Sequence, residues 1–170
     1  PAANQCALPT TLVIAIQPIE TPLFDPIGSL CSGQTAPVLF NQSNNGINGS
    51  WSPSVISNTA SDFYTFTPAA GECANSVTLF VEVNPLPVAT ISGGTSVCTG
   101  EATSALFTGT PNATVSYSRD NGPVQFVTLN NTGTASVSTG FLLNNTTYTL
   151  INAATQNCLA TLNGSTSFTV

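Results

Sequence analysis

The chain has 170 residues and a formal net charge of −6; only 5% of its residues are charged, with Arg119 as the one basic residue and no histidine. Hydrophobic residues make up 41% of it, too many for a disordered chain, because disorder combines low hydrophobicity with high charge. One cation cannot neutralise a phosphate backbone, which excludes nucleic acid as a partner, and without a spanning apolar run or a basic amphipathic helix we expect no direct membrane insertion.

A segment near the start of the chain returns twice further along. "QCALPTTLVIAIQP" (5–18) joins a cysteine, an apolar run and a proline, and a shift of 67 positions places it on "ECANSVTLFVEVNP" (72–85). A third copy, "CLATLNGSTSFTV", begins at Cys158. The same shift places "CSGQTAPVLF" (31–40) on "CTGEATSALF" (98–107). Internal repetition decides an architecture, so these copies define the domain organisation.

The segment at 31–40 has one copy, at 98–107, and so occurs twice. The segment that starts with the cysteine at 6, 73 or 158, called the tail below, occurs three times. These counts predict two full repeats, 18–85 and 86–170. Residues 1–17 are then the last strand of a preceding repeat, or an N-terminal strand donated to another subunit. The joints "QPIETP" and "NPLPVA" are short and rich in proline. Proline fixes φ and removes a hydrogen-bond donor, so we expect these joints to be extended, semi-rigid hinges.

The apolar residues inside a repeat follow the period of a β-strand. Val77, Leu79, Val81 and Val83 stand at alternate positions, and "RDNGP" (119–123) is a strong turn signal between β-branched runs. No segment shows a helical stripe. Many short strands separated by Gly, Asn and Pro are typical of a Greek-key sandwich. The predicted fold is therefore all-β, with tandem Ig-like Greek-key β-sandwiches, each with an intradomain disulfide, joined by short Pro-rich hinges.

The five cysteines predict disulfides rather than a metal site. They are widely spaced, and the chain has no histidine and no C-x-x-C motif, so we expect no zinc. We pair Cys31 with Cys73 and Cys98 with Cys158, one bond in each repeat, and leave Cys6 unpaired. Such bonds contribute about 4 kcal/mol in the chain-entropy model. The alternative pairs Cys6 with Cys31 and Cys73 with Cys98. Either scheme requires an oxidising, extracellular setting.

The aromatic residues are expected to form cores. Trp51 in "GSWSP" could be a sugar-stacking platform, but a strand tryptophan packed in the core is the preferred interpretation. Tyr64 and Tyr148 stand 9 and 10 residues before Cys73 and Cys158, which suits a buried role similar to a tyrosine corner. Tyr117 is the candidate that replaces Trp51 in the second repeat.

Two loop tips are the candidate binding loops, "NQSNNGINGS" (41–50) and "RDNGP" (119–123). Their candidate residues are Asn44, Asn45, Asn48, Arg119, Asp120 and Asn121. Glu20 and Asp25 are the only cue for calcium, which needs six to eight converging oxygens, so no metal and no cofactor is expected. Without histidine or lysine the chain lacks most general bases, and it has no nucleophile elbow or phosphate loop. We expect no catalysis.

Several segments together resemble a known family. "SVCTGEATSALFTG", "GSWSPSVIS", "FYTFTPAAGECANSVTLFVEVNPLP" and "TTYTLINAATQNC" look like the Ig-like tandem repeats of very large surface proteins in Bacteroidota. The resemblance covers nearly the whole chain. It implies secreted cell-surface arrays that serve as stalks and adhesins, some of them linked to gliding motility.

The leading functional hypothesis is a structural rod or stalk segment of an extracellular bacterial adhesin or filament. Its partners are neighbouring repeats of the same array or identical subunits. One alternative is a module that binds a surface glycan or protein through the loop tips. Another is a filament subunit that assembles by donating the strand at 5–17.

Overall fold

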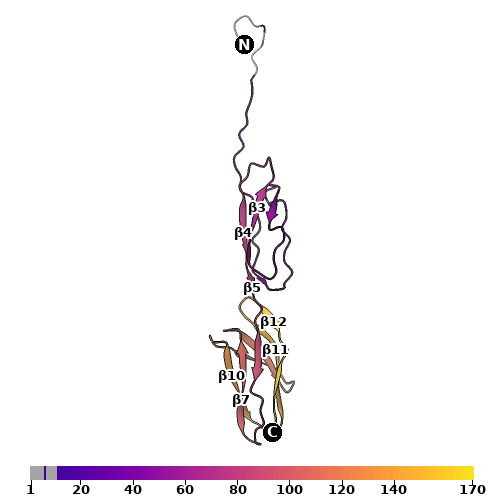
Figure 1. Cartoon of the computed structure of the whole chain (residues 1–170), viewed down its shortest axis with the longest axis vertical. Helices are drawn as coiled ribbons and strands as arrows, with labels where there is room; N and C mark the ends of the chain where they lie inside the picture. The colour runs from indigo at the N-terminus through magenta and orange to yellow at the C-terminus, as the bar shows by residue number, and fades with distance from the viewer. Residues whose placement is uncertain (1–5, 7–10) are drawn as a thin grey trace. The chain divides into compact units, whose positions relative to one another are not determined.

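The computed structural model describes Cys6 and residues 11–170, and strands are the only regular secondary structure among them (Figure 1). The all-β prediction is therefore confirmed. The chain divides into two compact units, each assembled from separate stretches. The first takes the described part of Pro1–Pro26 with Val38–Val55 and Phe63–Leu79, and the second takes Ile27–Pro37, Ile56–Asp62 and Phe80–Val170. The continuous repeats at 18–85 and 86–170 stay a prediction made from the sequence.

The first unit contains most of one sheet in the order β2-β3-β4, of which only Asp62 and Phe80–Val81 are assigned to the second unit. Its strands are β2 (Gly49–Ser52), β3 (Asp62–Pro68) and β4 (Val77–Val81). In β3 the side chains of Tyr64 and Phe66 are buried while their neighbours along the strand are more exposed, as the period of two requires. Trp51 on β2 lies opposite Phe66 in the antiparallel register, so one face of this sheet carries the aromatic core.

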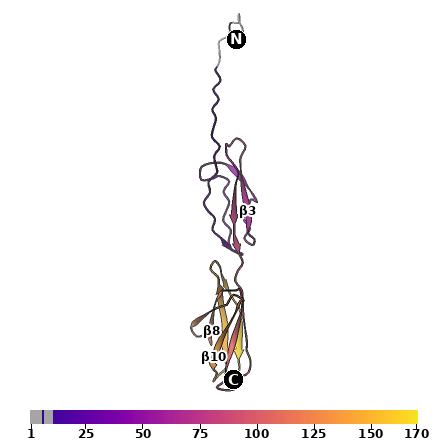
Figure 2. The same cartoon turned by 90° about the vertical axis from the view of Figure 1, so that its left-hand side faces the viewer.

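The second unit contains a β-sandwich. One sheet has the order β10-β7-β6, and the other has the order β12-β11-β8-β9 with β13 also paired to β11; β8 and β10, labelled in Figure 2, belong to different sheets. The strands are β6 (Ala89–Ser92), β7 (Ala102–Gly109), β8 (Thr114–Arg119), β9 (Val124–Thr128), β10 (Thr134–Phe141), β11 (Thr146–Ala154), β12 (Leu159–Thr161) and β13 (Ser165–Phe168).

The core of this sandwich is filled from both sheets. Phe107 on β7 packs with Tyr117 on β8 and with Tyr148 and Leu150 on β11. The ring centroids of Phe107 and Tyr117 are 4.9 Å apart, and those of Tyr117 and Tyr148 are 5.9 Å apart, distances typical of favourable aromatic pairs. Burial of these large side chains is the main stabilising contribution to the unit.

A short parallel ladder brings two further stretches of the chain together in the second unit. β1 (Leu30–Cys31) pairs with β5 (Val83–Asn84), with Cys31 opposite Asn84. The backbone N–H of Leu30 donates to the carbonyl of Glu82 at 2.9 Å, and that of Ser32 donates to the carbonyl of Asn84 at 2.8 Å. The ladder places Cys31 beside Asn84, the last residue of β5, from which the chain continues into β6.

The segment predicted as a strand at 5–17 differs from that expectation. Its described part, residues 11–17, forms no strand, and positions 5 and 7–10 lie outside the described residues. Leu12, Val13 and Ile16 are 80–92% exposed. A strand is defined by its pairing, and these residues have no strand beside them among the described residues, so an apolar pattern alone does not produce the element.

Candidate functional site

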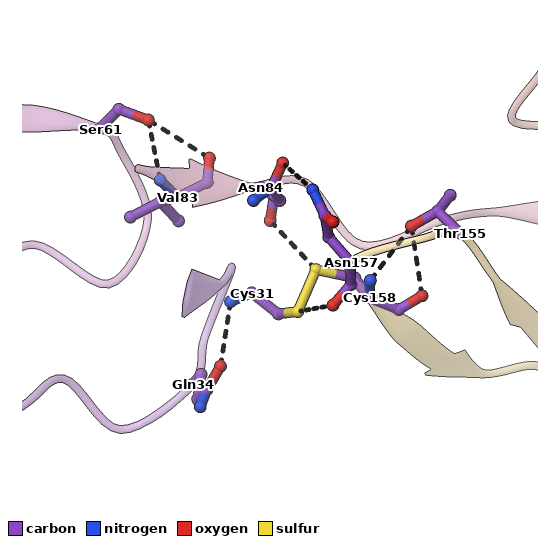
Figure 3. The surroundings of a disulfide bond; sticks show 8 residues. All are labelled: Cys31, Gln34, Ser61, Val83, Asn84, Thr155, Asn157 and Cys158. Carbon is purple, nitrogen blue, oxygen red and sulfur yellow. Dashed lines mark hydrogen bonds between the residues drawn. A yellow bond between two sulfur atoms is a disulfide. The ribbon is translucent and has the colours of Figure 1, made fainter. Parts of the chain in front are cut away.

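The most distinctive feature of the described residues is a disulfide between Cys31 and Cys158 (Figure 3). The two residues are 127 positions apart, and their Cα atoms are separated by 5.7 Å, which lies in the range that a disulfide requires. Both belong to the second compact unit. Cys31 ends β1, and Cys158 directly precedes β12.

A tight turn holds Cys31. Its backbone N–H donates to the side-chain oxygen Oε1 of Gln34 at 3.0 Å, and the N–H of Gln34 donates to the carbonyl of Cys31 at 2.9 Å. Gly33 has φ of +82°, a conformation that glycine adopts at no steric cost. The N–H of Gly33 also donates to the carbonyl of Asn58 at 2.8 Å. The turn therefore fixes the backbone of Cys31 and with it the direction of the bond from Cα to Cβ.

The Cys158 side is fixed by Thr155 and Asn157. Thr155 donates its N–H to the carbonyl of Cys158 at 2.8 Å, and the N–H of Cys158 donates to Oγ1 of Thr155 at 3.1 Å. Asn157 donates from Nδ2 to Oδ1 of Asn84 at 3.3 Å, and its carbonyl oxygen lies 3.3 Å from Sγ of Cys31 (Figure 3). These contacts surround the disulfide with polar groups from three stretches of the chain.

The predicted disulfide pairs are wrong. Cys31 bonds to Cys158, while Cys73 and Cys98 are exposed free thiols, so neither Cys31–Cys73 nor Cys98–Cys158 forms. The alternative pairs, Cys6–Cys31 and Cys73–Cys98, do not form either. The expectation of one disulfide in each repeat is corrected with them, because the described residues contain this one bond. Cys6 is an exposed thiol without a disulfide among the described residues.

The geometry of the second unit explains why Cys98 cannot reach Cys158. Val97, beside Cys98, donates its N–H to Thr169 next to the Thr146 end of β11, whereas Cys158 follows the Ala154 end of the same strand. A strand of this length separates its two ends by about 27 Å. Cys73 belongs to the other compact unit from Cys31. The sequence argument assumed that each repeat closes on its own cysteines.

The predicted core aromatics are buried. Trp51, Tyr64, Tyr117 and Tyr148 are between 1% and 6% exposed. Trp51 donates from Nε1 to the carbonyl of Phe40 at 2.9 Å, which satisfies its one polar atom. An indole this deeply buried offers no face on which a sugar ring could stack.

The amide side chains of the loop at 41–50 form hydrogen bonds with other residues of the first unit. Oδ1 of Asn45 accepts from the N–H of Leu23 at 3.0 Å, and Nδ2 of Asn44 donates to Asp25 at 3.0 Å. Oε1 of Glu72 accepts from both the backbone N–H and Nδ2 of Asn48 at 3.1 Å. These three asparagines therefore fix the loop to the rest of the first unit.

The turn at 119–123 is bonded in the same way. Asp120 and Asn121 have φ of +51° and +57°, as the two central residues of a type I′ turn require, and the N–H of Gly122 closes this turn by donating to the carbonyl of Arg119 at 2.8 Å. Asp120 accepts the N–H of Thr147 at 2.7 Å. Arg119 donates to the carbonyl of Thr139 at 3.0 Å, and its guanidinium lies 5.8 Å from the ring centroid of Tyr148. The side chain of Arg119 therefore stabilises the hairpin. That it binds a ligand stays a prediction.

The described residues contain no group of three or more Cys, Asp or Glu side chains that could hold a metal ion. Glu20 instead pairs through its backbone with the stretch at Cys73 and Asn75, and Asp25 accepts from Asn44. No helix found among the described residues is long and apolar enough to cross a membrane.

Sequence reasoning missed the polar residues around the disulfide. Gln34, Asn84, Thr155 and Asn157 were not predicted as site residues, because they are four of many amides and hydroxyls in this chain. One signal for the turn was present. The repeated elements "CSGQ" and "CTGE" carry glycine and an acceptor side chain at the same offsets from their cysteines.

No protein-family model matches the chain, and no curated protein matches it at a significant level. The sheets and the Cys31–Cys158 bond define the class instead: an all-β protein that contains a β-sandwich and a long-range disulfide. A disulfide fits a secreted protein, because such bonds persist in oxidising surroundings.

Proposed function

We propose that this chain is a load-bearing structural segment of an extracellular rod or stalk and carries out no catalysis. The observation that carries the proposal is the Cys31–Cys158 disulfide. A force that pulls on the chain outside this pair passes through the sulfur–sulfur bond. Residues 32–157 then lie within a covalent loop and are not extended.

The loop encloses most of the sandwich in the second unit. Strands β6 to β11, from Ala89 to Ala154, all lie between the two cysteines in sequence. Unfolding under load is thereby limited to the residues outside the pair unless the disulfide is reduced.

The composition supports an extracellular structural role. Charged residues are only 5% of the chain, far below the average of about 25% for soluble domains, so neighbouring segments repel one another weakly when they lie side by side. The resemblance to surface arrays supports the same role. The proposal includes attachment to a cell surface and an origin in Bacteroidota.

Single-molecule force spectroscopy tests the proposal directly. The chain is held by handles at its two ends and extended with and without a reducing agent. Reduction should release residues 32–157, which span the sequence separation of 127 positions between the two cysteines and add about 440 Å of contour length. The Cys31→Ser variant should show the longer extension under both conditions. Equal extensions of the original chain with and without reductant would contradict a load-bearing disulfide.

A second candidate function is assembly by strand donation through residues 5–17. It is favoured by Leu12, Val13, Ile14 and Ile16, whose side chains are 76–92% exposed, because a donated strand needs free apolar side chains. Replacing Val13 and Ile16 with Ser should then weaken self-association measured by analytical ultracentrifugation. An unchanged association constant would count against this candidate.

A further inference from the structure

The turn that carries Cys98 is a structural copy of the turn that carries Cys31. The N–H of Cys98 donates to Oε2 of Glu101 at 3.3 Å, as that of Cys31 does to Gln34 at 3.0 Å. The N–H of Glu101 donates to the carbonyl of Cys98 at 3.0 Å, which reproduces the bond from Gln34 to Cys31. The same scaffold therefore presents a free thiol at Cys98.

The backbone of the two turns agrees as well. Gly33 and Gly100 have φ of +82° and +85°. The N–H of Gly100 donates to the carbonyl of Leu142 at 2.7 Å, as that of Gly33 does to Asn58 at 2.8 Å. Cys98 thus occupies a turn with the same backbone conformation and hydrogen bonds as the turn that carries the bonded Cys31.

The kind of partner follows from the disulfide that exists. Cys31 is bonded to Cys158, which begins the third copy of the tail, and the other tail cysteines are Cys6 and Cys73. Cys98 should accordingly accept a tail cysteine. Its own repeat's tail cysteine, Cys158, is bonded to Cys31 and lies at the opposite end of β11, so Cys98 requires a different tail cysteine.

Cys73 is the tail cysteine best prepared for this bond. Its backbone is held by the stretch at Glu20, because the carbonyl of Cys73 accepts the N–H of Glu20 at 2.8 Å and the N–H of Asn75 donates to the carbonyl of Glu20 at 2.9 Å. Its thiol is exposed and lines an open hollow of about 290 Å³ with Gln17, Pro18, Glu20 and Glu72. This hollow leaves room for an incoming turn.

The surface beside the Cys98 turn also suits contact with another protein surface. Leu142, which is buried, accepts the N–H of Gly100 and donates its own N–H to Glu101. Its two neighbours, Phe141 and Leu143, are 79% and 68% exposed. Exposed apolar side chains at this place would be covered by a docked partner, which stabilises the contact.

We propose that Cys98 of one copy forms a disulfide with Cys73 of a second copy, so that copies of this chain join in series. The inference rests on the proposed structural function and names its partner. Two S–H bonds break and one S–S bond forms. The two protons and two electrons pass to a low-molecular-weight disulfide such as glutathione disulfide, which is reduced to two thiols.

Charge sets the conditions under which this bond forms. Glu101 belongs to the Cys98 turn, whereas Glu20 and Glu72 line the hollow at Cys73, so the two surfaces repel each other at low salt. Screening is effective over about 8 Å at physiological ionic strength. We expect linkage to be faster at higher salt, and faster in Glu101→Gln, which reproduces the uncharged turn of Cys31.

The experiment incubates the purified chain, with its Cys31–Cys158 bond intact, in glutathione disulfide. After the remaining thiols are blocked, the products are separated without reductant and digested with a protease that cleaves after glutamate. Cleavage after Glu20, Glu72, Glu82 and Glu101 places each of the five cysteines in a different peptide. The expected product is a ladder of oligomers that contains peptide 73–82 bonded to peptide 83–101.

Matched variants decide the direction of linkage. Cys98→Ser alone and Cys73→Ser alone should remain monomeric, while Cys6→Ser should still form the ladder. A mixture of Cys98→Ser and Cys73→Ser should give dimers and no longer species, because each copy retains one half of the junction.

Three results would overturn the inference: a chain that stays monomeric, oligomers bonded Cys98 to Cys98, or oligomers that require Cys6. The proposed function is judged separately, because the force experiment uses a single chain. A failure of linkage with an intact load-bearing loop would remove this inference alone.

Discussion

Sγ of Cys31 is covalently bonded to Sγ of Cys158 across 127 positions of sequence, with 5.7 Å between their Cα atoms. The bond ties a turn from the first predicted repeat to the approach to β12. It therefore cross-links the chain between two elements that the sequence places in different repeats, and it makes the stability of the second unit dependent on both.

Removal of this disulfide should lower the stability of the second unit strongly. The chain-entropy model assigns about 5 kcal/mol to closure of a loop of 127 residues. We expect Cys158→Ser to reduce the free energy of unfolding by several kcal/mol in urea denaturation followed by circular dichroism. Cys98→Ser, which removes an exposed free thiol, is the matched control and should leave the midpoint unchanged. Similar midpoints for the two variants would show that the cross-link contributes little.

Trp51 should be the most sensitive position of the first unit. Its ring centroid lies 4.7 Å from that of Phe24 and 5.3 Å from that of Phe66, and Nε1 is bonded to the carbonyl of Phe40. Trp51→Ala should cost about 3–5 kcal/mol. Trp51→Phe keeps a ring and loses the hydrogen bond, which costs about 1 kcal/mol. Thermal unfolding of both variants checks this order, and equal losses would show that the hydrogen bond matters more than packing.

Gly133 and Gly140 separate backbone strain from collision. Both have positive φ, +75° and +66°. A Cβ at Gly133 would collide with the carbonyl oxygen of Gly109, whereas a Cβ at Gly140 would meet nothing within 4 Å. Gly140→Ala should cost about 1–2 kcal/mol, the penalty of a left-handed conformation.

Gly133→Ala should lower the free energy of unfolding by about 1–3 kcal/mol more than Gly140→Ala does, because its Cβ also collides with Gly109. Denaturant midpoints of the two variants measure the difference. If Gly140→Ala proved the more destabilising of the two, the close approach of Gly133 to Gly109 would not be a feature of the protein.

The second unit should lose stability at alkaline pH. Burial, with a smaller effect from Tyr148, raises the pKa of Tyr117 above its ordinary value of 10.0. The folded state therefore binds the phenolic proton more tightly than the unfolded state does. The resulting stabilisation is complete below pH 10 and is lost as the pH rises through the folded-state pKa.

Urea denaturation at a series of alkaline pH values measures this loss. Tyr117→Phe has no proton to lose, so the stability of that variant should decline less steeply with pH than that of the original chain. Parallel declines would show that Tyr117 does not ionise in step with unfolding.

The sequence was sufficient to predict the fold class. Val77, Leu79 and Val81 alternate as a strand, and β4 covers them; "RDNGP" predicted a turn, and Asp120 and Asn121 form one. Local periodicity and turn chemistry produced these predictions, and both depend on residues that are close in sequence.

The disulfide partners could not be predicted, because they depend on which stretches share a compact unit. Ile27–Pro37 joins Phe80–Val170 through the parallel β1–β5 ladder, and no local pattern reports a parallel pairing of two residues. The strand predicted at 5–17 is absent from its described part, residues 11–17, for a related reason. Its apolar residues match the tail that forms β4, but a strand also needs a neighbour.

Disulfide mapping of the monomeric chain tests the central claim most directly. Free thiols are blocked, the chain is cleaved after glutamate without reduction, and the bonded peptides are identified by mass spectrometry. A bond between peptides 21–72 and 102–170 is the predicted result, since these contain Cys31 and Cys158. Bonds from 21–72 to 73–82 and from 83–101 to 102–170 would contradict it, because each repeat would then close on its own cysteines.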